Sequence, residues 1–277
     1  MNSQLAIVPA AKFQRARGQL KLSVQRADGD VTRLRNLRQQ GSYRAIFPRP
    51  IASNVEAVII NTAGGVTGGD RFTTSITAHE AAQVSVTTQA AERIYRATEP
   101  ATGTMKTTLC AEKSAQLYWL PQETILFDGA RLHRSLDVDL HRTAKFLMVE
   151  PLVFGREASG ETLRSGLLDD RVAIARDGQP IFMDRIHLEG DIAASLARPA
   201  TAHGARAVAS IVLVDPQAQA FLAALRDLLP PNAGASLLSD TVLVARILAA
   251  DSYALRCALF PILTLLTNNA VPKNWRL

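Results

Sequence analysis

The sequence predicts a mainly β protein with two α-helices in its C-terminal quarter, and three observations lead to this class. From about residue 18 to residue 214, apolar residues recur at every second position, which is the period of a half-buried strand. Turns rich in glycine and aspartate separate these segments. After residue 214 the apolar spacing becomes helical. We therefore expect a β body over about 18–214, followed by helices at about 215–229 and 251–266.

The predicted strands follow one another at short intervals. Alternating residues at 20–24 lead into the turn at 27–30, which is a hairpin signal, and a second such signal lies at 176–179. Repeated short strands with these turns are typical of a largely antiparallel all-β body. Further strands are expected at 55–60, 72–78, 84–88, 132–140, 207–214 and 243–248.

The two predicted helices have recognisable ends. Asp215 is a good N-cap with Pro216 at the first helical position, and the prolines at 230–231 end this helix. Asp251 can cap the second helix, in which Pro261 is expected to cause a kink. This second helix is apolar on nearly every face, so it is either buried or docked on a partner. No change of composition marks a linker, and we expect one domain over 1–277.

The composition excludes several classes of protein. The 277 residues are 47% apolar, which suits a packed core and argues against general disorder. Two distant cysteines and five scattered histidines make a disulfide framework, a structural zinc site and a metal store all poor interpretations. The sequence therefore favours a protein of a reducing compartment.

The net charge of +6 is unevenly distributed. Residues 1–50 contain ten Lys or Arg and two acids, whereas the rest of the chain carries a small negative charge. These cations alternate with apolar residues, which favours the solvated face of a strand over a nucleic-acid arm. Residues 5–11 lack the pattern of a secretory signal, and no apolar run has the roughly 18 residues of a membrane span.

The most distinctive local motif is the glycine-rich segment at 61–70, with four glycines within six residues. Gly64 and Gly69 have the spacing of a Walker A loop, but Asp70 and Arg71 stand where that motif needs lysine and a hydroxyl residue. A strand follows, so no helix N-terminus is available for a phosphate. The segment is either a tight turn or a surface that presents Asp70 to a ligand or partner.

Two further carboxylates, Glu150 and Asp184, each follow a run of apolar residues. A carboxylate is costly to bury without a partner or water, so each is either a strand end at the surface or a functional group. The sequence contains neither a G-x-S-x-G nor an H-E-x-x-H motif. His133 and His141 lie roughly 26 Å apart on an extended strand, too far to share one ion.

Five motifs occur together in a characteristic order: residues 61–72 (NTAGGVTGGDRF), 87–96 (TTQAAERIYR), 119–130 (WLPQETILFDGA), 155–161 (GREASGE) and 234–236 (GAS). Together they closely resemble the UreD (UreH) family of urease accessory proteins, from Gly41 to Trp275. At 92–93, Glu-Arg stands where the family usually has a small polar residue followed by lysine, so no role is transferred to Glu92.

The resemblance implies a cytoplasmic maturation factor that is not itself an enzyme. Family members bind UreF directly and the GTPase UreG through the complex, which docks on apo-urease and helps deliver nickel, with GTP hydrolysed by UreG. The implied fold is a single domain of stacked, β-helix-like strands with two helices. The resemblance also implies that these helices form part of the surface that meets UreF. The resemblance implies a hetero-oligomer with no tightly bound cofactor, no nucleic acid and no membrane.

A water-filled tunnel is the route proposed for nickel in this family. Mapped by motif, Asp70, Glu150 and Asp184 are the candidates for residues that line it and bind nickel transiently. Spaced carboxylates and water suit transit, whereas a tight His/Cys cage would retain nickel. The alternative is a purely structural β-rich adaptor without metal passage. A standalone hydrolase or nucleotide-binding enzyme would need a lysine or a nucleophile–base set that the sequence does not show.

Overall fold

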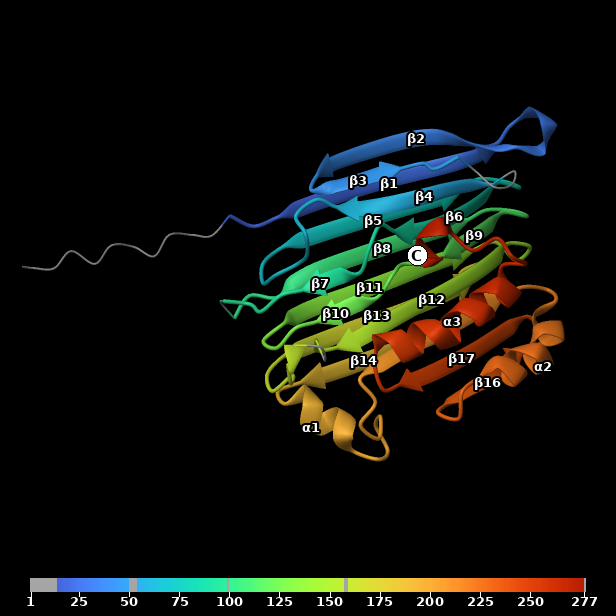
Figure 1. Cartoon of the computed structure of the whole chain (residues 1–277). Coiled ribbons are helices and arrows are strands. Elements are labelled where there is room, and N and C mark those ends of the chain that lie inside the picture. The colour runs from blue at the N-terminus through green and yellow to red at the C-terminus, as the bar shows by residue number, and fades with distance from the viewer. Residues whose placement is uncertain (1–13, 50–53, 99, 157–158, 277) are drawn as a thin grey trace, which may run out of the picture.

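Two facing β-sheets form the body of the protein in the computed structural model (Figure 1), which describes residues 14–49, 54–98, 100–156 and 159–276. Sheet A has seven strands in the spatial order β14-β13-β11-β8-β5-β1-β2. Their bounds are β1 (Arg17–Arg26), β2 (Thr32–Gly41), β5 (Arg71–Ala78), β8 (Gly103–Ala111), β11 (Arg131–Leu140), β13 (Leu167–Arg176) and β14 (Gln179–Glu189).

Sheet B has ten strands, eight of them in the order β16-β17-β15-β12-β9-β6-β4-β3. Two short strands, β7 and β10, pair with each other, and β10 also pairs with the end of β12. The bounds are β3 (Tyr43–Ile46), β4 (Val55–Asn61), β6 (Gln83–Thr88), β7 (Glu92–Ile94), β9 (Gln116–Trp119), β10 (Thr124–Leu126), β12 (Lys145–Phe154), β15 (Ala207–Val214), β16 (Ala233–Ser239) and β17 (Val242–Ala249).

The long strands from β4 to β13 pass alternately from one sheet to the other, so the chain winds in stacked coils. β1, β5, β8, β11 and β13 are parallel neighbours in sheet A, as are β4, β6, β9 and β12 in sheet B. The expected stack of β-helix-like strands in a single domain is confirmed.

The expectation of a largely antiparallel body is wrong. In the described ranges, antiparallel pairs flank the parallel strands: β1–β2 and β13–β14 in sheet A, and β3–β4 and the run β12–β15–β17–β16 in sheet B. An alternating pattern shows that one face of a strand is buried, but it gives no information about the partner or its direction. Both predicted hairpins are confirmed among these antiparallel pairs, around Asp28–Asp30 and around the left-handed pair Asp177 and Gly178.

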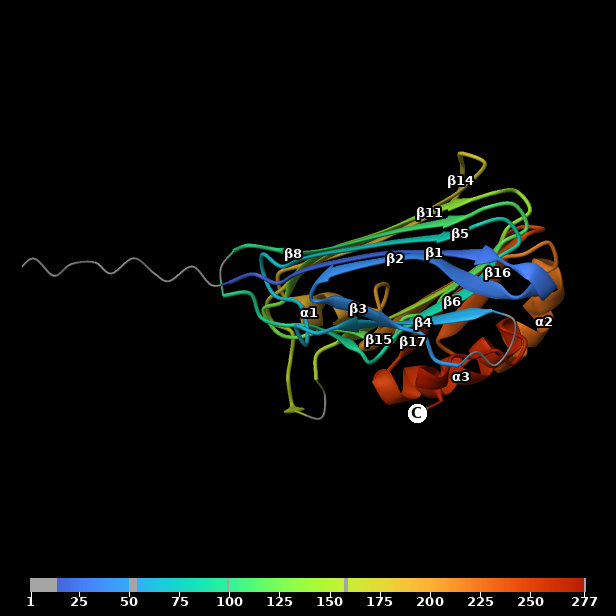
Figure 2. The ribbon, with the colours of Figure 1, turned by 90° about the horizontal axis from the view of Figure 1, so that it is seen from above.

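Helices α2 (Ala218–Leu228) and α3 (Ser252–Leu266) pack on the outer face of sheet B (Figure 2). The N-cap role of Asp251 is confirmed, since its carboxylate accepts a hydrogen bond from Ala254 N at 2.7 Å. Asp215 is not the N-cap of α2, which is Gln217; its carboxylate instead accepts from Gln217 N and pairs with Lys145. A six-residue helix, α1 (Ile192–Ala197), was not expected.

The apolar core has two parts, because sheet B is covered on both faces. One part fills the space between the sheets, and the other lies between sheet B and helices α2 and α3. On β12, Phe146 and Met148 belong to the first part, while Leu147 and Val149 belong to the second. The buried residues of α3 belong to the second part of the core. This face of the helix is therefore buried within the protein and is not available for docking on a partner.

No helix in the described ranges is both long enough and apolar enough to cross a lipid bilayer. Residues 5–11, considered above for a secretory signal, lie outside the described residues, as does part of the motif at 155–161.

Candidate functional site

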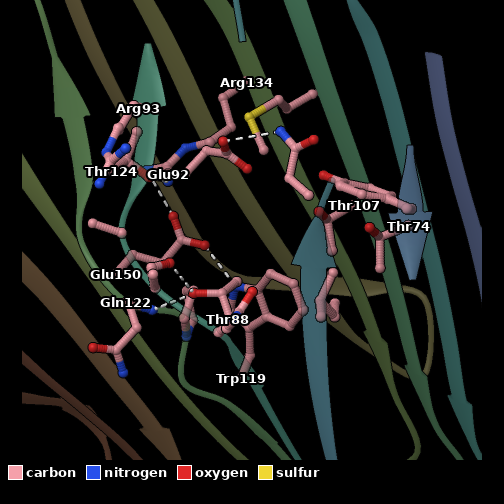
Figure 3. Close-up of a pocket in the computed structure, with 18 of the residues that line it drawn as sticks. Thr74, Thr88, Glu92, Arg93, Thr107, Trp119, Gln122, Thr124, Arg134 and Glu150 are labelled. Atoms are coloured by element: carbon pink, nitrogen blue, oxygen red, sulfur yellow. Dashed lines mark hydrogen bonds and ion pairs between the residues drawn. The ribbon is translucent and has the colours of Figure 1, made fainter. Parts of the chain in front are cut away.

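A cavity of about 210 Å³ lies between the two sheets near the short strands β7 and β10 (Figure 3). Trp119 and Glu150 line it from sheet B, while Thr107 and Arg134 line it from sheet A. Its other polar lining residues include Asn61, Thr74, Thr88, Glu92, Gln122 and Thr124. The cavity therefore brings polar and charged side chains together within an otherwise apolar interior.

The charged groups of this cavity are held by the inward faces of adjacent strands. Arg134 lies in the apolar row of β11, and Asp170 is its register partner on β13. Arg134 donates to both carboxylate oxygens of Asp170, at 2.8 and 2.5 Å. Its third contact is Thr124 Oγ1, at 3.1 Å. A bidentate pair of this kind fixes the orientation of the guanidinium.

Glu150 reaches the same guanidinium from sheet B. Its Oε2 lies 2.7 Å from Arg134 Nη2, and its Oε1 accepts from Trp119 Nε1 at 2.6 Å. Among the described residues, no well-directed hydrogen bond reaches Oε2. Besides its ion pair with Arg134, this oxygen therefore keeps lone pairs that can accept a hydrogen bond from a water molecule in the cavity.

Burial dominates the electrostatics of the cluster. Desolvation raises the pKa of Glu150 above its ordinary value; Arg134 opposes this rise and the neighbouring Asp170 adds to it. Burial alone would lower the pKa of Arg134, but the two carboxylates raise it above the usual range. One permanently charged guanidinium thus faces two carboxylates that compete for it.

Glu92 is a second carboxylate of the cavity. Its Oε1 accepts from Asn61 Nδ2 at 3.0 Å, and desolvation raises its pKa to about 7 despite hydrogen bonds from Asn61 and the Arg93 backbone. Asn61 also donates to Gly65 O at 3.1 Å. The glycine-rich segment therefore positions a group that lines the cavity, a role that the sequence did not reveal.

Close packing explains part of the glycine content of this segment. At Gly65, with φ of 151°, a Cβ atom would lie 2.4 Å from the Tyr95 ring and 2.6 Å from Arg93 O. Asp70 is buried in the same segment. Its two carboxylate oxygens accept from Ala16 N at 2.8 Å and from Thr67 N at 2.9 Å. These bonds tie the loop to the start of β1, which is a structural role.

Asp184 lies elsewhere. It is on β14 at the margin of sheet A and forms an ion pair with Arg246 of β17, so that it joins the two sheets. With Ser210 it lines a separate pocket. Of the three predicted residues, only Glu150 lines the central cavity, Asp184 lines the other pocket, and Asp70 lines neither.

Sequence reasoning missed Arg134, Trp119 and Asp170. A signal existed for two of them, since Arg134 and Asp170 interrupt the apolar rows of β11 and β13 at inward positions. Within the described ranges, no group of three or more His, Cys, Asp or Glu side chains is arranged to hold a metal ion. What the arrangement offers is a cavity lined by polar side chains and by the single carboxylates of Glu92 and Glu150.

Comparison with known proteins identifies the family. Residues 16–276 match the family described as UreD urease accessory protein. This chain belongs to the UreD family. A urease accessory protein UreD from Roseobacter denitrificans is 48% identical over 263 residues, covering 95% of this chain and 96% of that protein. The UreD of Ruegeria pomeroyi is 49% identical over 247 residues, with 89% and 96% covered, and that of Rhizobium rhizogenes is 45% identical over 265 residues, with 95% and 96% covered.

Membership of the UreD family shows that this protein is a urease accessory protein. The family match extends over both sheets and all three helices, so it includes every residue of the cavity described above. Arg134, Glu150 and Asp170 therefore belong to the UreD domain itself.

Proposed function

We propose that this chain is a non-catalytic maturation factor that helps deliver nickel to urease in the cytoplasm. In this proposal it binds UreF directly and the GTPase UreG through the complex, and the complex docks on apo-urease. GTP hydrolysis belongs to UreG. The observation that carries the proposal is UreD family membership over residues 16–276, together with relatives named as urease accessory proteins.

The cavity between the sheets supports the nickel part of the proposal. A conduit has to bind an ion weakly enough to release it, and single carboxylates in a polar space do so better than a closed cage of His and Cys ligands. Glu150 Oε2 is the carboxylate oxygen best placed for this, because it lines the cavity and lacks a directed hydrogen bond within the described part of the chain.

Asp70 and Asp184 have weaker support as transit residues. Both oxygens of Asp70 are occupied by backbone N–H groups, and Asp184 is engaged with Arg246. In the proposed route, Asp184 acts outside the central cavity, in its separate pocket, where its side chain is about a quarter exposed. Asp70 contributes to the proposed route indirectly, because its carboxylate holds the glycine-rich loop in its conformation.

Complementation tests the proposal directly. A urease-positive bacterium that lacks its own UreD is expected to regain urease activity when this chain is expressed with the matching UreF, UreG and urease subunits. Co-purification with UreF should accompany the activity. Failure to restore activity, with the chain expressed and folded, would contradict the proposed role.

A further inference from the structure

The outer face of sheet A is covered by no described element, whereas α2 and α3 cover sheet B on the opposite side of the molecule (Figure 2). Alternation along the strands points the polar residues of sheet A outward. Basic side chains dominate this face on strands that lie side by side. We call the following set the basic face: Arg17, Lys21, Arg38, Arg71, Lys106, Arg171 and Arg185.

Six of these seven cations form like-charge pairs across neighbouring strands. Arg17 is the register partner of Arg71. In the same way Lys21 lies opposite Arg38, and Arg171 lies opposite Arg185. Like charges directly opposite each other destabilise a sheet. Three such pairs on one face are therefore a cost to folding that an anionic partner would remove.

Few acids neutralise this charge. Asp169 binds Arg185 at 2.7 Å, and this hydrogen bond, with the positive charges nearby, holds the pKa of Asp169 below its ordinary range. Asp137 lies 3.9 Å from Arg171. The other five cations take part in no ion pair with a residue of the described ranges.

The size of the basic face fits a protein partner. It extends from β2 to β14, which are seven adjacent strands or roughly 29 Å at the usual strand spacing. An interface of ordinary size buries about 800 Å² on each partner, a patch of similar width. The face also contains carboxylates that would repel phosphates, and the large apolar side chains exposed in the described ranges include no aromatic ring on it for base stacking.

We propose that the basic face of sheet A is a docking surface for an acidic protein surface on apo-urease. This inference rests on the proposed function, which supplies the partner, and adds the surface and the charge that meet it. Charge complementarity of this kind speeds association and fixes orientation, and it makes binding sensitive to salt.

The test measures binding of the full-length chain to purified apo-urease by biolayer interferometry at low and physiological salt. The variant R38E/R71E/K106E is expected to bind at least about tenfold more weakly and with a reduced salt dependence. Its Tm should be unchanged or higher, because Arg71→Glu and Arg38→Glu place acids opposite Arg17 and Lys21. If the basic face had only a structural role, the variant would not bind apo-urease more weakly while its Tm stayed unchanged or rose.

The matched control R142E/R164E/R198E changes the net charge equally at exposed positions outside the face and should bind within about twofold of the unchanged chain. Equal binding by the two triple variants would overturn the docking surface while leaving the proposed function intact. No binding of the unchanged chain to apo-urease would contradict the proposed function itself. Duplex DNA that binds more tightly than apo-urease, and loses binding in R38E/R71E/K106E, would overturn the choice of an acidic protein as occupant.

Discussion

The guanidinium of Arg134 lies 2.7 Å from the carboxylate of Glu150, and the pair bridges the two sheets in the interior of the protein. Both side chains are at least nine-tenths buried. Ion pairs in such surroundings contribute little net stability, but removing one partner leaves an uncompensated buried charge. The pair therefore links the stability of the fold to the chemistry of the cavity.

Removal of Arg134 should be strongly destabilising. Arg134→Met leaves Glu150 and Asp170 buried without their cation, and we expect a loss of about 3–5 kcal/mol in the free energy of unfolding. Urea denaturation followed by circular dichroism measures it. The double variant with Glu150→Gln should recover part of the loss, and Arg142→Met, at an exposed position, should change stability by less than about 0.5 kcal/mol. An equally small effect of Arg134→Met would show that the cluster is not buried as described.

Asp70 should matter for the stability of the glycine-rich loop. Asp70→Ala leaves Ala16 N and Thr67 N without their acceptor, and the expected cost is about 3 kcal/mol. Asp70→Asn keeps one acceptor oxygen and should cost roughly half as much. The denaturant midpoints of the two variants measure this order. If both variants were as stable as the unchanged chain, the loop would not depend on these bonds.

The stability of the protein should depend on pH through Glu92. Its pKa is raised from 4.5 to about 7 in the folded state, so the folded state favours the neutral form. The resulting stabilisation is complete below pH about 4.5, declines as pH rises, and is lost above pH about 7. Its size is about 3 kcal/mol, because one pKa unit corresponds to about 1.4 kcal/mol. The difference in unfolding free energy between the unchanged chain and Glu92→Gln should follow this curve, and a difference independent of pH would contradict it.

Asp184 allows a test that separates the ion pair from the carboxylate. Its pair with Arg246 is partly exposed, so Asp184→Ala and Arg246→Ala should each cost no more than about 1 kcal/mol. If Asp184 serves nickel transit, only Asp184→Ala should lower urease activation, since Arg246→Ala keeps the carboxylate. Urease activity per folded accessory protein measures the effect. Equal activation by both variants would remove Asp184 from the route.

Local patterns predicted much of the fold. Alternation located the buried residues of β1, β5 and β11, and the N-cap at Asp251 was recognisable from its type and position. The direction of strand pairing was not predictable in this way, because a strand of a stacked coil and a strand of a hairpin bury the same alternate residues. The strand β16 contains Gly234, Ala235 and Ser236 near its start, which weakens any apolar pattern.

The site was predicted only in part, for a related reason. Glu150 follows an apolar run, and its place on the inward face of β12 brings it into the cavity. Its partner Arg134 is sixteen positions earlier and in the other sheet, so their contact depends on the register of the whole stack. Asp70 belongs to the family motif, yet its carboxylate serves the loop itself.

The most direct test of nickel passage through the cavity between the sheets is the nickel content of urease activated in vitro. Apo-urease is incubated with nickel, GTP, UreF, UreG and this chain, and bound nickel is measured after gel filtration. Glu150→Gln keeps an acceptor for Trp119 but removes the negative charge, and we expect nickel content and urease activity to fall at least about tenfold while complex assembly is retained. Glu112→Gln, a change at a half-buried carboxylate away from the cavity, should behave like the unchanged chain. Full nickel loading with Glu150→Gln would contradict passage through this cavity.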